Sequence, residues 1–136
     1  MTSPYGRKAK ATKFEGQTYR SRIEAEWAKV LNRYPNIEYE KKTRGVYYLP
    51  DFTIGSAVIE VKPMRWNGYP QIPSKWIEKA IACAGNTGNA VLIVFGAPGY
   101  RKIECCQVTY GTSGIMLEML NLSTRQIHQW VQEHML

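Results

Sequence analysis

The chain has 136 residues and a formal net charge of +7, from 18 Lys and Arg against 11 Asp and Glu. This length favours one domain that is large enough to bury a core. An apolar content of 44% with 12% aromatic residues argues against a disordered protein. No apolar run approaches the roughly 20 residues that a membrane span needs, and the N-terminus lacks the apolar stretch of a secretory signal. The three cysteines form no C-x-x-C pair, so we expect no disulfide framework, no zinc site and a reducing cytoplasm.

The predicted elements begin with a basic, flexible arm over residues 1–17, and a single domain is expected over residues 18–136. Ser21 and Glu24 have the spacing of a capping box and open a helix. The apolar residues of this helix recur every three or four positions, as on one helical face. Pro35 ends it, because the residue before a proline disfavours the helical conformation.

Short extended segments and two more helices follow. Residues 63–73 contain three prolines and a glycine and are predicted to form a loop. The other elements, in chain order, are strands at 37–40, 46–52 and 57–61, a helix at 74–84, strands at 91–95 and 104–110, and a helix after Ser123. The order α-β-β-β-α-β-β-α favours an α/β (mixed α+β) fold, with a central mixed sheet flanked by helices.

Positive charge gathers at two places along the chain. Residues 1–22 hold six Lys or Arg against one acid, and a second cluster lies at residues 41–44, both beside aromatic residues. Such clusters suit a polyanion, nucleic acid above all. For the arm taken alone, a solvated tail explains the charge equally well. The candidate nucleic-acid-binding cations are Arg7, Lys8, Lys10, Lys13, Arg20, Arg22, Lys41, Lys42 and Arg44.

The acids are distributed differently, since six of the eleven lie between residues 24 and 60. Asp51 is the only Asp in the chain and directly follows a proline. Side chains alternate along a strand, so Glu60 and Lys62 are expected on one face of theirs. If the segments before and after the Gly55-Ser56 turn pair antiparallel, Asp51 and Glu60 lie side by side.

Two neighbouring carboxylates stay ionised only when a cation compensates them. Mg²⁺ suits this role, because it is typically held by one or two carboxylates together with substrate phosphate. Lys62 is then placed to orient an attacking water or to neutralise charge in the transition state of phosphodiester hydrolysis. The alternative is an ordinary Pro-Asp turn and an exposed strand, although the apolar residues flanking both motifs place the charges at the edge of a core.

The chain resembles the PD-(D/E)XK nuclease superfamily, which has the restriction-endonuclease-like fold. That family shows Pro-Asp, a spacer and then Asp/Glu-x-Lys, with an acid on the first helix. Four segments match in order over roughly residues 14–66: Y-R-S-R-I-E (19–24), I-E-Y-E (37–40), Y-L-P-D-F (48–52) and I-E-V-K (59–62). The resemblance is strongest to the junction-resolving endonucleases of short-tailed phages, and it extends to the donor-cutting nuclease subunits of some transposition systems.

The resemblance implies that Asp51 and Glu60 bind Mg²⁺, or Mn²⁺ in its place, and that Lys62 is the catalytic lysine. It implies Glu24 as the acid of the first helix, in competition with a role as helix cap. Glu40 would be a further acid behind the metal ligands. Trp66 follows Lys62 closely and would either stack on a base or pack over the site.

The leading hypothesis is therefore a Mg²⁺-dependent DNA endonuclease that forms a homodimer, with no membrane association and no small-molecule cofactor. Branched DNA such as a four-way junction is the favoured substrate, and linear duplex or single strands remain open. A non-catalytic nucleic-acid-binding module on the same scaffold is the first alternative, and a basic structural protein of a virus is the second.

Overall fold

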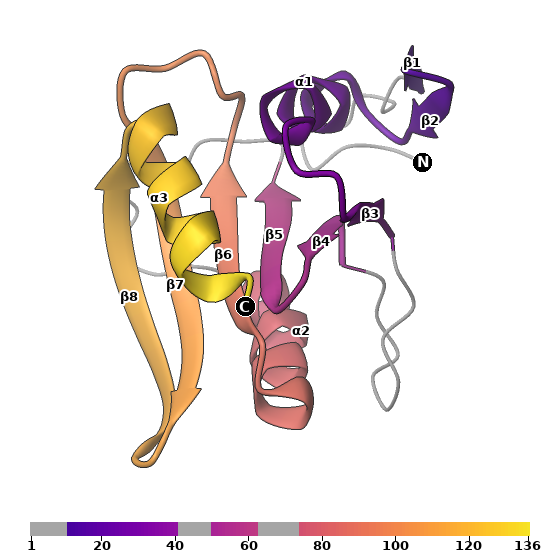
Figure 1. Ribbon diagram of the computed structural model, residues 1–136. Helices are drawn as coiled ribbons and strands as arrows, with labels where there is room; N and C mark the ends of the chain where they lie inside the picture. Colours follow the sequence, from indigo (N-terminus) through magenta and orange to yellow (C-terminus); the bar gives the residue numbers. More distant parts are fainter. Residues whose placement is uncertain (1–10, 41–49, 63–73) are drawn as a thin grey trace.

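The computed structural model describes residues 11–40, 50–62 and 74–136. Within them, a six-stranded mixed sheet has the order β3-β4-β5-β6-β7-β8. Helices α1 and α3 pack against one face of the sheet and α2 against the other (Figure 1). This arrangement confirms the predicted α/β class with a central mixed sheet flanked by helices. Among the described helices, none is long and apolar enough to cross a membrane.

A small hairpin precedes the first helix and differs from the flexible arm expected over residues 1–17. Strands β1 (Thr12–Phe14) and β2 (Gln17–Tyr19) pair antiparallel across a two-residue turn. The turn residues Glu15 and Gly16 have φ angles of 54° and 79°, the conformation that two-residue hairpin turns favour. The hairpin packs through Phe14 and Tyr19 onto the core, which the composition of the arm did not indicate. Residues 1–10 of the predicted arm lie outside the described residues.

Helix α1 (Arg22–Leu31) begins where the sequence predicts, because the Ser21 side chain accepts a hydrogen bond from the Glu24 backbone N–H at 3.1 Å. Its inner face buries Trp27 completely. The Trp27 indole N–H donates to the Gly96 carbonyl at 2.8 Å, at the end of β6. Burial and this bond together fix α1 over the ends of the central strands.

The central strands bring the two acidic motifs next to each other. Strand β3 (Ile37–Tyr39) pairs antiparallel with β4 (Phe52–Ile54), and β4 pairs antiparallel with β5 (Ala57–Lys62). Strand β5 runs parallel to β6 (Ala90–Phe95) and is joined to it through helix α2 (Ser74–Thr87). The strand predicted at 46–52 is thus described only from residue 52, and residues 46–49 lie outside the described residues.

A long hairpin completes the sheet. Strand β7 (Ile103–Gly111) pairs antiparallel with β6 and with β8 (Gly114–Leu122), which forms the edge of the sheet. Strand β8 is absent from the predicted order. Its side chains show no alternation of burial, and Met116 and Leu117 are both exposed. This strand is held by backbone hydrogen bonds to β7 and has no buried face. Its sequence therefore lacks the alternation of apolar and polar residues from which a strand is predicted.

Helix α3 (Thr124–His134) opens with the predicted capping box, in which Ser123 and Gln126 bond each other's backbone N–H groups. Its buried His128 contacts the hydroxyl of Tyr34, which lies just after α1; the Nδ1 to oxygen distance is 2.8 Å. Burial and the nearby charge of Arg33 lower the pKa of His128. The folded protein therefore favours the neutral imidazole.

This histidine makes stability depend on pH. The unfolded imidazole takes up a proton near pH 6.5, whereas the folded one does so only at lower pH, so the stabilisation present above pH 6.5 is lost as the pH falls below it. Each unit by which the pKa is lowered reduces stability in acid by about 1.4 kcal/mol, or about 6 °C in unfolding midpoint for a domain of this size. We expect His128→Gln to lose less stability than the wild type between pH 7.5 and 5, as measured by thermal unfolding; equal losses would contradict the assignment.

Candidate metal centre

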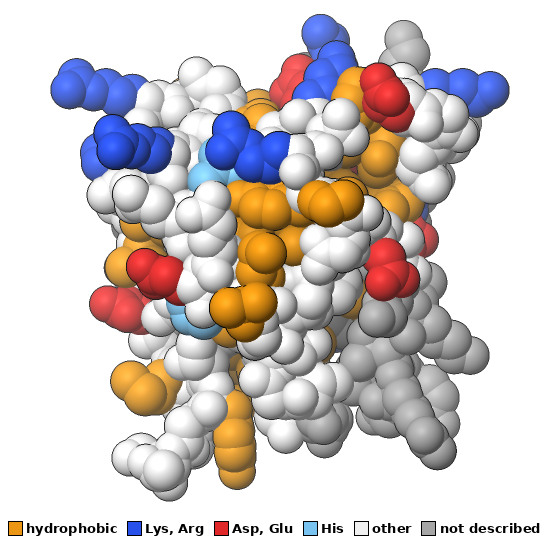
Figure 2. Space-filling view, in the orientation of Figure 1, with side chains coloured by type: hydrophobic (Ala, Val, Ile, Leu, Met, Phe, Trp, Pro, Cys, Tyr) orange, Lys and Arg blue, Asp and Glu red, His pale blue; other side chains and the backbone are white. Residues whose placement is uncertain are grey.

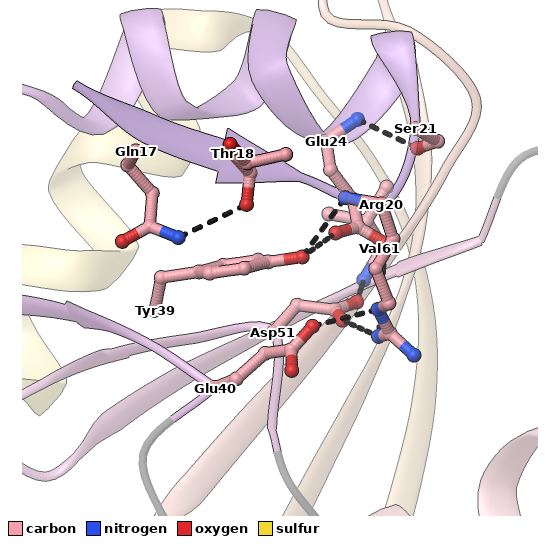
Figure 3. Close-up of polar contacts among 9 residues, drawn as sticks. All are labelled: Gln17, Thr18, Arg20, Ser21, Glu24, Tyr39, Glu40, Asp51 and Val61. Carbon is pink, nitrogen blue, oxygen red and sulfur yellow. Dashed lines mark hydrogen bonds and ion pairs between the residues drawn. The ribbon is translucent and has the colours of Figure 1, made fainter. Parts of the chain in front are cut away.

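Asp51 and Glu60 lie next to each other on adjacent strands. Phe52 pairs with Ile59 in the β4–β5 hairpin, so the next position along places Asp51 opposite Glu60, as the Gly55-Ser56 turn predicts. Both side chains are buried. The Val61 backbone N–H donates to Asp51 Oδ2 at 2.7 Å and fixes the orientation of that carboxyl group (Figure 3).

The Arg20 guanidinium lies among three carboxyl groups contributed by different parts of the chain (Figure 3). Its Nη2 is 2.8 Å from Asp51 Oδ1 and 3.7 Å from Glu24 Oε2, and its Nε is 2.7 Å from Glu40 Oε1. The Arg20 side chain remains 53% exposed, whereas that of Asp51 is 1% exposed. The sequence predicted Arg20 as a cation for nucleic acid, and the structure shows that it also neutralises the buried acids.

Glu24 faces this cluster and does not fold back onto its own helix end. Its backbone N–H bonds Ser21, but its carboxylate accepts a hydrogen bond from the Tyr39 hydroxyl and pairs with Arg20. Only half of the predicted capping box is therefore described, and the side chain points toward Asp51 (Figure 3). The Glu24 carboxylate thus belongs to the acidic cluster, and its role as a metal ligand stays a prediction.

Tyr39 joins the elements of the cluster and was not predicted as a site residue. Its hydroxyl donates to Glu24 and accepts from the Arg20 backbone N–H at 3.2 Å. Its ring packs against those of Tyr19 and Phe52, with centroids 4.6 Å and 5.6 Å away. The alternation in I-E-Y-E indicates that Tyr39 and Ile37 share one strand face. The sequence does not show which groups the Tyr39 hydroxyl bonds, because these contacts depend on how the β1–β2 hairpin packs against β3.

Glu40 approaches Arg20 from the end of β3. Its backbone is in the left-handed region, with φ of 52°, which a residue with a side chain rarely adopts. The Glu40 carboxylate forms the ion pair with Arg20 Nε without the angle of a hydrogen bond. Glu40, the predicted supporting acid, therefore joins the cluster by its ion pair with Arg20. It makes no described contact with the Asp51 or Glu60 side chains.

The cluster holds more negative charge than Arg20 compensates. Burial raises the pKa of Asp51 well above its usual range, and the charge of Glu60 and a hydrogen bond with it add to this shift. Burial and the charge of Asp51 raise the pKa of Glu24, against the opposing effects of Tyr39 and Arg20. Three carboxyl groups therefore meet one guanidinium, with Glu60 beside Asp51 as a fourth, and an additional cation would stabilise their ionised forms.

The donor set fits a hard divalent cation. Asp51 and Glu60 offer carboxylate oxygens on two neighbouring interior strands of the sheet. Mg²⁺ is commonly held by one or two protein carboxylates alongside water and phosphate. As the side chains stand, the described part of the chain contains no group of three or more His, Cys, Asp or Glu arranged to hold a metal ion. Of the three predicted metal ligands, Asp51 and Glu60 are therefore next to each other. Glu24 is separated from Asp51 by Arg20.

Lys62 is the last residue of β5 and is partly exposed. Strand alternation places it on the same face as Glu60 and Val58, the face covered by α2. The Lys62 carbonyl accepts a hydrogen bond from the Gly96 N–H at 2.8 Å, which ties the ends of the two central parallel strands. Lys62 thus lies two residues beyond Glu60 on the same face of β5, at the end of the strand and partly open to solvent.

The remaining predicted cations are divided between described and undescribed residues. Lys13 is exposed on β1, and Arg22 is 81% exposed with Glu26 3.9 Å away. Trp66 lies outside the described residues, and so do the other predicted cations: Arg7, Lys8, Lys10, Lys41, Lys42 and Arg44.

Comparisons of the chain with protein-family models, with curated proteins and with solved structures found no match.

Proposed function

We propose that this protein is a Mg²⁺-dependent endonuclease that hydrolyses phosphodiester bonds of DNA. The observation that carries the proposal is the pair of buried carboxyl groups, Asp51 and Glu60, side by side at the end of a strand that also carries Lys62. When bound there, the metal ion would polarise the scissile phosphate and lower the pKa of a water molecule. The resemblance to PD-(D/E)XK nucleases supports the same roles.

The chain's own residues hold and orient the reactants. The Val61 N–H bonds Asp51 Oδ2 and Arg20 bonds Asp51 Oδ1, so the carboxyl group that would hold the metal has a defined orientation. Lys62 stabilises charge that develops on the phosphate or orients the attacking water. Arg20, which is half exposed beside Asp51, is placed to contact a phosphate as well as the acids.

Structure-selective or weakly sequence-specific cutting fits best, with branched DNA as the favoured substrate and a phage or mobile element as the setting, in the host cytoplasm. A homodimer would supply two active sites for the two strands of a junction. The alternative is a non-catalytic nucleic-acid-binding module on the same scaffold. It is distinguished by tight DNA binding without cleavage under any divalent metal.

The test is a nicking assay on supercoiled plasmid and on matched linear, flapped and four-way substrates, with Mg²⁺, with Mn²⁺ and with chelator. We expect cleavage only with metal, and we expect Lys62→Ala to lower its rate at least about 100-fold while DNA affinity changes little. Lys79→Ala, on the exposed face of α2, is the matched control and should cleave as the wild type does. An unchanged rate for Lys62→Ala would contradict the site.

A further inference from the structure

A second group of cations lies apart from those that the sequence singled out. Arg101 and Lys102 are exposed on the loop between β6 and β7, Arg125 is exposed in the first turn of α3, and Arg33 is exposed just after α1. We call these four residues the α3-side cationic surface. Lys and Arg side chains gather at the upper left of this face of the molecule (Figure 2), where Figure 1 places the β6–β7 loop and the start of α3.

Contacts between the elements hold these cations on one surface. The Lys102 Nζ donates to Gln126 Oε1 at 3.2 Å, next to Arg125. The Thr124 hydroxyl lies 3.5 Å from the Pro98 carbonyl, so the loop and the helix start touch at a second point. Arg33 is close enough to α3 for its charge to affect His128, one turn beyond Arg125. The loop and the helix start are thus in contact, and Arg33 lies on the same side of the sheet near α3.

The sequence keeps acids away from this surface. No Asp or Glu occurs in residues 96–103, 119–132 or 27–37, which supply the loop, most of α3 and the segment around Arg33. Arg22, by comparison, has Glu26 3.9 Å away. A group of three arginines and a lysine on ordered backbone, in segments without acids, matches a chain of phosphates better than it matches any single small anion.

A short piece of chain, the β6–β7 loop, links the α3-side cationic surface to the candidate metal centre. Gly96 bonds the Lys62 carbonyl, and the loop then runs from Gly96 to Lys102. Six residue steps span at most about 20 Å. Because phosphates of one strand advance about 3.4 Å along the duplex axis, Lys102 lies within about six phosphates of a scissile bond at Lys62.

We infer that the α3-side cationic surface binds the phosphodiester backbone of duplex DNA that flanks the cleaved bond. The choice of DNA rests on the proposed function, but the surface itself acts in binding and not in the chemical step. It is independent of the predicted N-terminal cations, and it would hold one arm of the substrate along the loop and the start of α3.

The test is the salt dependence of DNA affinity for the triple variant Arg101→Gln, Lys102→Gln and Arg125→Gln. Binding of a fluorescent 30-base-pair duplex is measured by anisotropy between 50 and 300 mM salt, with chelator present so that no cleavage intervenes. Each lost phosphate contact lowers the slope of log affinity against log salt by about 0.9. We therefore expect a slope reduced by about 2.7 and an affinity lower by about tenfold or more at low salt.

Lys79→Gln is the control, because this exposed lysine lies on α2, across the sheet from the surface; its slope should equal that of the wild type. Thermal unfolding of the triple variant within about 2 °C of the wild type excludes a folding defect. A slope unchanged by the triple variant overturns the inference. A reduced slope in a protein that never cleaves DNA supports the surface and refutes the proposed nuclease activity, so the two failures are distinguishable.

Discussion

Replacing Asp51 by Asn is expected to abolish metal-dependent cleavage and to leave the metal-free protein at least as stable as the wild type. Asp51 is 1% exposed and lies beside Glu60. Its raised pKa shows that burial and the neighbouring carboxyl disfavour its charge in spite of Arg20 at 2.8 Å. An amide of the same shape removes that charge and is a far poorer metal ligand than a carboxylate.

The contacts around Asp51 explain why the variant should still fold. The amide oxygen can accept the hydrogen bond from the Val61 N–H in place of Asp51 Oδ2. The amide NH2 then takes the place of Oδ1 and cannot accept from Arg20 Nη2, so the half-exposed guanidinium must turn away from it. Arg20 keeps its ion pairs with Glu40 and Glu24. The substitution therefore exchanges one ion pair for the removal of a repulsion between two buried carboxyl groups, and the second effect is expected to equal or exceed the first.

Two measurements separate this prediction from a general loss of structure. The nicking rate of Asp51→Asn should fall at least about 100-fold. Its unfolding midpoint without metal should match or exceed that of the wild type, and 10 mM Mg²⁺ should raise the midpoint of the wild type only, because ligands stabilise the state that binds them. Glu78→Gln, an exposed glutamate on α2, is the control for removing one negative charge and should behave as the wild type does. Retained cleavage or a much lower midpoint would refute the role of Asp51.

Local rules were sufficient to predict the part of the candidate site that lies on one hairpin. The two-residue turn at Gly55-Ser56 sets the register between β4 and β5, and the register alone brings Asp51 opposite Glu60. The starts of α1 and α3 followed in the same way from serine caps and their partners three residues on. These features depend on neighbours in sequence, so a pattern over a few residues determines them.

The network around Arg20 depends on contacts between distant segments and could not be predicted in this way. A positive charge at residue 20 indicates a polyanion partner equally well whether the guanidinium faces solvent or three carboxylates. Its actual position follows from the β1–β2 hairpin and from Tyr39, whose hydroxyl meets both the Arg20 backbone and Glu24. The hairpin was missed because its turn, Glu15-Gly16, places a glutamate in a left-handed conformation that asparagine or glycine usually occupies.

Gly55→Ala is expected to destabilise the fold strongly, by about 2–4 kcal/mol. Gly55 has a φ of 58°, and an alanine in this region costs about 1 kcal/mol or more. A Cβ at Gly55 would also lie 2.0 Å from the Met135 carbonyl oxygen, a backbone atom at the end of α3. That oxygen accepts a hydrogen bond from the Ser56 N–H at 3.1 Å, so moving it away loses about a further 1 kcal/mol.

Gly88→Ala separates the two causes. Gly88 has a φ of 73°, but a Cβ there meets nothing within 4 Å among the described residues. Gly88→Ala should therefore lower the free energy of unfolding only by the conformational strain, about 1 kcal/mol. Its unfolding midpoint should fall by about 4 °C, against about 10 °C or more for Gly55→Ala. Equal losses in urea and thermal unfolding would show that α3 does not contact the β4–β5 turn. A larger loss at Gly55 would show that the turn which aligns Asp51 with Glu60 is held in place by the end of α3, so that the candidate site depends on a helix that contributes no side chain to it.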